Sequence, residues 1–139
     1  MSTVVGSTSV SFVGDATLAR YVRTVGGQPV TAADGALVAT PHVLVPYCPV
    51  SADRSDIDVN ANPWMDTKTL GSARVVLPRG GKRVVGTWSR PSSSAPATFT
   101  DAAGNPLLLA PGTTFAALGR PGAPALFSWS GRRRTRCSR

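Results

Sequence analysis

Residues able to carry out acid–base or nucleophilic catalysis are few and scattered in this chain. The single histidine, His42, lies beside Pro41 at the start of a predicted strand, residues 42–47. Nucleophilic catalysis needs a base beside the nucleophile and a third group to orient that base, and the chain has no Gly-x-Ser-x-Gly turn. We therefore interpret His42 as a partly buried structural residue. A hydrolase that uses His42 as its base stays open as an alternative.

Carboxylates are also sparse. The chain has seven acidic residues, and Asp53, Asp56 and Asp58 lie close together in one stretch. Carboxylate oxygens bind hard cations, but this stretch lacks the Asp-x-Asp-x-Asp-Gly spacing and the closing glutamate of a calcium-binding loop. We interpret it as a solvated acidic loop, and we expect neither a bound metal nor a cofactor.

A glycine-containing loop at residues 78–82 joins two predicted strands. A phosphate-binding loop would instead open a helix, so this pattern predicts a hairpin turn. The cations Arg79, Lys82 and Arg83 at its tip are typical of charges that prevent sheets from pairing edge to edge.

Trp88 and Arg90 are the most informative candidates, because they lie two residues apart on a predicted strand and so share a face. Tryptophan and arginine often anchor interfaces, and the two side chains could form a cation–π stack. In the other interpretation, Trp88 belongs to the core and Arg90 covers it with its aliphatic stem. For a binding surface we select Trp88, Ser89 and Arg90, with Asn105 positioning the neighbouring turn. We select no catalytic residue.

The elements that position these residues are predicted to be strands. Short β-branched runs alternate with turns rich in the 14 glycines and 12 prolines, and helical periodicity is nearly absent. A length of 139 residues fits one domain. We expect a mainly β fold, a single, mostly antiparallel sheet domain with long loops and at most one short helix. Strands at 73–78 and 82–90 form a hairpin, and 51–70 is an irregular excursion.

Charge and composition divide the chain into three segments: a flexible start at 1–8, the β domain at 9–120, and a Pro/Gly linker with an arginine-rich tail at 121–139. The net charge is +8, but without the five arginines at 132–139 it falls to +3. We interpret the tail as a solvated end. The alternative is a small basic protein that binds nucleic acid through this tail.

Two cysteines, Cys48 and Cys137, show no metal-binding or redox spacing. We expect two free thiols, and a disulfide that ties down the tail is the alternative. No segment is long enough to cross a membrane as a helix, and no signal peptide or lipid-attachment cysteine is recognisable in the chain as written.

Two stretches carry a resemblance to a known family. Residues 71–91 contain Gly-Thr-Trp-Ser-Arg after a Gly-Lys turn, and residues 99–115 contain Phe-Thr-Asp-Ala-Ala-Gly-Asn-Pro followed by Pro-Gly-Thr-Thr-Phe. Together they resemble the C-terminal domain of the YerB-like lipoproteins. The segments at 20–29 and 42–47 agree more weakly with the same pattern, so the resemblance spans about residues 9–120.

This resemblance implies a bacterial envelope protein with a signal peptide, an α/β domain and this β domain. The family's molecular function is unassigned, so no catalytic residue carries over. The chain departs from the pattern at His42, where asparagine is usual, at Phe115, where tryptophan is usual, and in its arginine tail. We expect a non-catalytic binding or scaffolding module of the cell envelope whose partner is an envelope protein or a cell-wall component. Without the signal peptide, the chain as written would stay in the cytoplasm.

Overall fold

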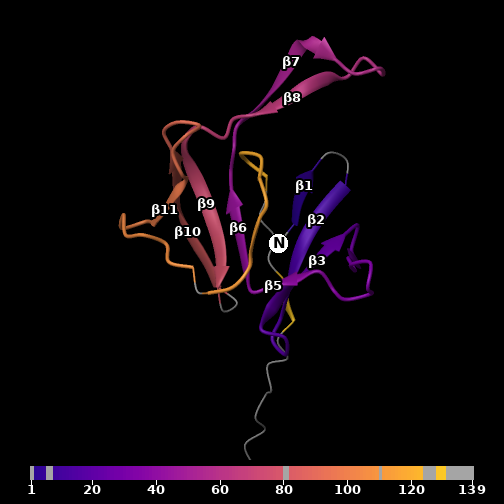
Figure 1. The fold of residues 1–139 in the computed structure, drawn as a ribbon, viewed down its shortest axis with the longest axis vertical. Helices are drawn as coiled ribbons and strands as arrows, with labels where there is room; N and C mark the ends of the chain where they lie inside the picture. Colours follow the sequence, from indigo (N-terminus) through magenta and orange to yellow (C-terminus); the bar gives the residue numbers. More distant parts are fainter. Residues whose placement is uncertain (1, 6–7, 80–81, 110, 124–127, 131–139) are drawn as a thin grey trace, which may run out of the picture.

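The computed structural model describes residues 2–5, 8–79, 82–109, 111–123 and 128–130 (Figure 1). All the regular structure in this part of the chain is strand, and antiparallel pairing dominates. The expected mainly β, mostly antiparallel fold is therefore confirmed. The strands form two sheets in the body of the domain and a separate two-stranded hairpin.

The first sheet is built around the long strand β2, which pairs with β1 and β3. Its members are β1 (Ser2–Val5), β2 (Thr8–Asp15), β3 (Arg20–Val25), β4 (Gln28–Pro29), β5 (Ala39–Thr40) and β13 (Ser128–Ser130). Strand β13 runs parallel to β2. Residues 2–5 thus form a paired strand inside the segment for which the sequence indicates a flexible start.

The second sheet has the order β11-β10-β9-β6-β12. Its members are β6 (His42–Pro46), β9 (Gly71–Arg79), β10 (Lys82–Arg90), β11 (Thr98–Asp101) and β12 (Thr114–Ala116). The predicted hairpin is confirmed, because β9 and β10 pair in one unbroken register from Arg79↔Lys82 to Gly71↔Arg90. Strand β6 is central, as its nearly continuous apolar run indicates, and the chain is buried from Val43 to Cys48.

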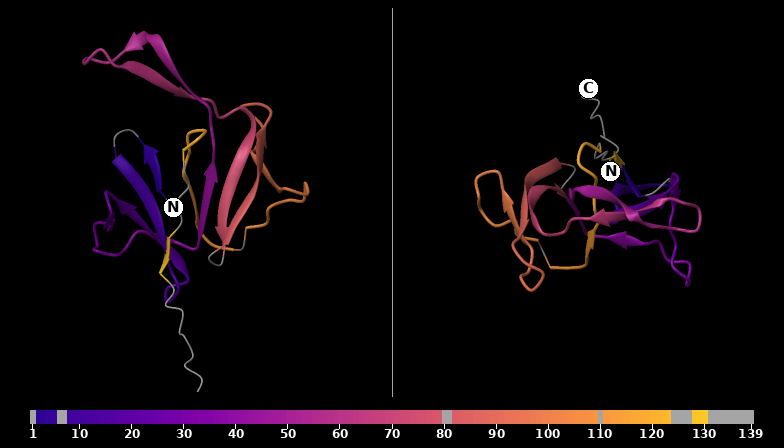
Figure 2. Two further views of the ribbon diagram at one scale, coloured as in Figure 1. Left: turned by 180° about the vertical axis from the view of Figure 1, so that it is seen from behind. Right: turned by 90° about the horizontal axis from the view of Figure 1, so that it is seen from above.

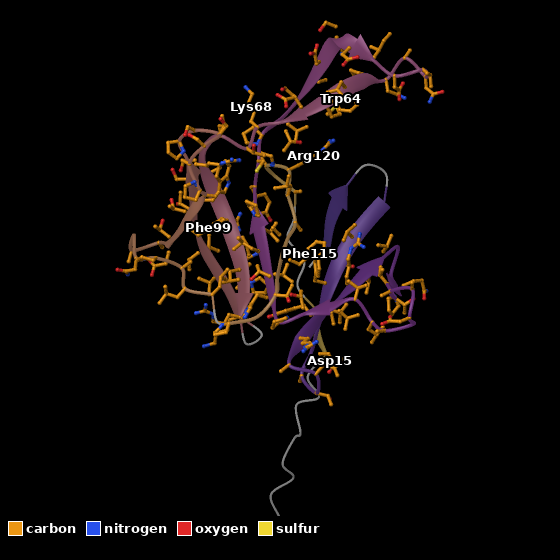
Figure 3. The ribbon with its side chains drawn as sticks, viewed as in Figure 1. Asp15, Trp64, Lys68, Phe99, Phe115 and Arg120 are labelled. Atoms are coloured by element: carbon orange, nitrogen blue, oxygen red, sulfur yellow. The ribbon has the colours of Figure 1, made fainter. Side chains whose placement is uncertain are left out.

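One hydrophobic cluster lies between the two sheets. Phe12 from β2 packs against Phe115 from β12, with ring centroids 5.1 Å apart, and Figure 3 shows Phe115 pointing into the space between the sheets. Val43 and Val45 from β6 belong to the same cluster. These side chains come from alternate positions of β6, so the opposite face of β6 supports a second cluster.

The second cluster lies on the other face of the second sheet and contains Trp88. Leu44 from β6 and Val75 and Leu77 from β9 pack with it, and Leu107 covers its edge. Strand β11 approaches β10 closely here. A Cβ added to Gly86 would lie 2.0 Å from the carbonyl oxygen of Thr100 in β11, so only glycine fits at this crossing.

A two-stranded arm leaves the body between β6 and β9. It consists of β7 (Val50–Ile57) and β8 (Pro63–Thr67), which pair with each other and with no other strand of the described chain. Figures 1 and 2 show the arm projecting from the end of the body, with its tip directed away from β10 and β11. The prediction of an irregular excursion at 51–70 is therefore wrong. This polar segment forms a hairpin. Asp58 caps the turn at residues 58–62 by accepting hydrogen bonds from the backbone N–H groups of Asn60 and Asn62.

Candidate functional site

Trp88 is a core residue with one polar contact. It lies opposite Ala73 on β9 and Phe99 on β11, and only 3% of its surface is exposed. Its indole N–H donates a hydrogen bond of 3.0 Å to the carbonyl oxygen of Tyr47, within the buried interior. Of the two interpretations of Trp88, the structure therefore agrees with the core one.

Arg90 lies at the end of β10 and organises the loop that follows. Its Nε–H donates to the carbonyl oxygen of Ala95 over 3.0 Å, and its Nη2 donates to that of Ser93 over 2.6 Å. The guanidinium is thereby drawn toward this loop, and the cation–π contacts recorded in the described residues involve Arg23 and Arg74. Ser89, the residue between Trp88 and Arg90, accepts a hydrogen bond at its main-chain oxygen from Thr98.

Asn105 forms two hydrogen bonds within the turn after β11. Its side-chain amide donates to Asp101 Oδ2 over 3.2 Å, and its backbone N–H donates to Asp101 Oδ1 over 2.9 Å. The backbone and side-chain hydrogen bonds from Asn105 lower the pKa of Asp101 below its ordinary value. The polar side chains of Asp101 and Asn105 therefore bind each other within the turn.

Beside Trp88 the surface is hollowed into a small apolar pocket of about 120 Å³. Its lining residues are Pro46, Cys48, Thr69, Trp88, Arg90, Ala97, Phe99 and Leu118. Only Arg90 brings a charge to this lining. Burial raises the pKa of the Cys48 thiol, which keeps it protonated and poorly nucleophilic. The pocket can therefore hold an apolar group but offers little chemistry toward it.

The arm exposes large apolar side chains. Trp64 is 64% exposed and Val59 is fully exposed, and Ile57 and Met65 are also exposed. The register pairs Met65 with Ala52, so these two side chains share one face. The register shifts between Asp53 and Ile57, before the pair formed by Ile57 and Pro63. Trp64 pairs with Asp53, and alternation along β8 places this pair on the face opposite to Met65. The sequence analysis missed these residues. The available signal was the Asn-Ala-Asn turn flanked by Ile57 and Trp64.

Two of the arm's carboxylates, those of Asp53 and Asp58, accept hydrogen bonds within its turns. Asp53 accepts hydrogen bonds from the side chain and the backbone of Ser55, and these bonds lower the pKa of Asp53. The pKa of Asp58 is lowered in the same way, and the hydrogen bond from the backbone N–H of Asn62 is the largest cause. Within the described residues, no group of three or more His, Cys, Asp or Glu side chains is placed to hold a metal ion.

His42 lies at the start of β6, close to Gly112, whose φ is positive. Its Nε2 is buried and makes no hydrogen bond with any residue that the structure describes. No nucleophile or carboxylate is therefore aligned by this nitrogen. Cys137 and the arginines at 132–139 lie outside the described residues. The part of the chain that the structure describes contains no helix able to cross a bilayer.

Fold and site together define a small, mainly β domain with a tryptophan-centred core and a projecting arm. Comparison with sequence families assigns this class: the chain belongs to the family described as "Protein of unknown function (DUF3048) C-terminal domain", whose sequence profile matches residues 2–116. The resemblance inferred from residues 71–115 is confirmed.

Among solved structures, the domain is similar to the crystal structure of the YerB protein from Bacillus subtilis, with a TM-score of 0.65 at 18% identity. The likeness covers 84% of this chain and 37% of the YerB chain, so this chain corresponds to little more than a third of YerB. A search of curated proteins finds no match. The structural likeness confirms the fold.

Proposed function

We propose that this domain is a non-catalytic binding or scaffolding module of the bacterial cell envelope and that the β7–β8 arm is its contact surface. The observation that carries the proposal is the exposure of Trp64, Met65, Ile57 and Val59 on a hairpin that leaves the body. Apolar side chains gathered on one exposed element are typical of a protein–protein contact.

The architecture of the arm supports this role. An isolated two-stranded hairpin is marginally stable in water, because it has too little apolar surface to bury. The strands β7 and β8 each keep one free edge, and the structure places no other described strand against them. A partner that covers Trp64 or the Met65 face would therefore stabilise the arm while binding it.

The binding residues predicted from the sequence have structural roles in this proposal. Trp88 and Asn105 support the sheet and its turn, and Arg90 holds the loop at residues 92–95. Trp88 and Arg90 also line the pocket at the base of the arm. The envelope location rests on the resemblance to the YerB-like lipoproteins.

Capture of envelope proteins by the immobilised chain tests the proposal. The double variant Trp64→Ser/Met65→Ser should lose the captured proteins while its thermal unfolding stays unchanged, because both side chains are exposed. A matched control is Leu18→Ser/Leu37→Ser, which removes two exposed apolar side chains from the body. Capture that survives in the arm variant, or that disappears only when residues 131–139 are removed, would refute the arm as the contact surface.

A further inference from the structure

We propose that the arm of one copy docks on the pocket beside Trp88 of a second copy, so that the chain associates with itself. This inference rests on the proposed function in one respect, namely that the arm is a contact surface. It adds the partner and the site that receives the arm. The tip residue Val59 fills the pocket, with Ile57 beside it.

The pocket has the size and lining of a site for one aliphatic side chain. Its volume of about 120 Å³ is that of about four waters at ~30 Å³ each. Cys48 and Trp88 in its wall are both buried, and Trp88 is held by its hydrogen bond to Tyr47. The wall is therefore fixed before anything binds, which lowers the entropic cost of filling the pocket.

Arg90 places a positive charge in the lining of the pocket. The two hydrogen bonds of Arg90 leave further guanidinium N–H groups for an acceptor. Lys68 and Arg120 lie at the same end of the body, where the arm leaves it (Figure 3). An incoming segment that combines an apolar side chain with carboxylates would match this end of the molecule.

The arm is such a segment. Residues 50–67 carry four of the seven acidic residues of the chain and one cation, Arg54, which leaves three net negative charges. At the tip, the exposed carboxylate of Asp56 and the turn-capping carboxylate of Asp58 lie on either side of Ile57, and Val59 follows Asp58 directly. The arm thus presents apolar side chains amid negative charge to a site of opposite sign.

The tip of the arm points away from the pocket of its own copy. Two views of the ribbon show the tip directed away from β10 and β11, whose residues line the pocket. Direct pairing of two arms is disfavoured, because each carries three net negative charges. A second copy that exchanges arms with the first satisfies both conditions and closes as a two-fold dimer.

Sedimentation velocity on the full chain, over a concentration series at low and high salt, measures the association. We expect a monomer–dimer equilibrium that weakens at high salt. Val59→Asp should raise the dimer dissociation constant at least about tenfold, the effect of losing an interface anchor. Val85→Asp, which changes an exposed valine on β10, should leave the constant unchanged.

Ala97→Phe obstructs the pocket from its exposed rim and should also prevent dimerisation. If Ala97→Phe fails to fold, Leu118→Lys at another exposed lining position replaces it. Mixing Val59→Asp with the pocket variant should restore heterodimers, because one intact arm and one intact pocket remain in that pair.

A chain that stays monomeric at all concentrations overturns the inference, as does a dimer that survives both single variants. Dimerisation that disappears when residues 131–139 are deleted, with arm and pocket intact, also overturns it. In each of these cases the proposed function stands if Trp64→Ser/Met65→Ser still loses the captured envelope proteins. If that capture survives but the arm–pocket dimer is observed, the proposed function fails for outside partners and the inference stands.

Discussion

The indole N–H of Trp88 donates a 3.0 Å hydrogen bond to the main-chain oxygen of Tyr47, joining β10 to the end of β6 across 41 positions of sequence. Tyr47 is itself held on two sides. The Arg74 guanidinium lies 5.3 Å from its ring centroid, and a Cβ on Gly119 would lie 3.2 Å from the ring. This contact fixes the base of the arm and the wall of the pocket at once.

Replacing Trp88 by phenylalanine should destabilise the domain by about 2 kcal/mol. The substitution leaves the buried oxygen of Tyr47 without its donor and removes part of a packed ring. Urea unfolding followed by circular dichroism measures the free energy of unfolding. Thr87→Ala, at the exposed neighbouring position, should stay within about 0.5 kcal/mol of wild type. Equal effects at the two positions would contradict the structural role of the indole.

Gly86→Ala should destabilise the domain by about 2 kcal/mol or more, because the new methyl group would collide with backbone. The nearest atom, the Thr100 oxygen at 2.0 Å, belongs to β11 and cannot rotate away as a side chain can. The same unfolding measurement applies, and Ser72→Ala on the exposed start of β9 is the control. A Gly86→Ala domain of unchanged stability would show that β11 does not approach β10 so closely.

Asp101 should stabilise the turn after β11 only above acidic pH. Hydrogen bonds from Asn105 lower its folded-state pKa below the ordinary value of 3.8. The contribution is therefore fully present above 3.8 and is lost as the pH falls through the lower folded-state pKa. The difference in Tm between wild type and Asp101→Ala should shrink as the pH is lowered through this range. A difference that is constant with pH would exclude the charged capping interaction.

Trp64 should be accessible to solvent while Trp88 is not, since their exposed fractions are 64% and 3%. In a Trp129→Phe background, which leaves these two tryptophans, Trp64→Phe should remove the fluorescence component that acrylamide quenches more strongly and shift the remaining emission to the blue. It should leave the free energy of unfolding within about 0.5 kcal/mol of wild type. Strong quenching that persists in Trp64→Phe and disappears in Trp88→Phe would reverse the assignment.

The β9–β10 hairpin and the central strand β6 could be predicted from the chain because their signals are local. Alternation places Val84, Gly86 and Trp88 on one face, and Pro91 follows directly after the end of β10 at Arg90. The Asp101–Asn105 turn is equally local, as its hydrogen bonds span four residues. Each of these features depends on the dihedral preferences and polarity of neighbouring residues, and these properties follow from the residue types alone.

The arm was missed because its strands are exposed on both faces, so β7 shows no apolar alternation. Its pairing depends on the turn capped by Asp58, which is compatible with a loop as well as with a hairpin. Strand β1 was missed because a short small-residue segment becomes a strand only when β2 supplies its hydrogen bonds.

By itself, then, the amino-acid order determined the mainly β class, the family and the central hairpin, because alternation and turn chemistry act between near neighbours. Only the tertiary structure decided that Trp88 is enclosed rather than displayed. That outcome depends on Tyr47 and on Leu44, Val75 and Leu77 meeting it from two other strands. The same packing leaves the hairpin at residues 50–67 outside the body, where its apolar side chains remain open to a partner.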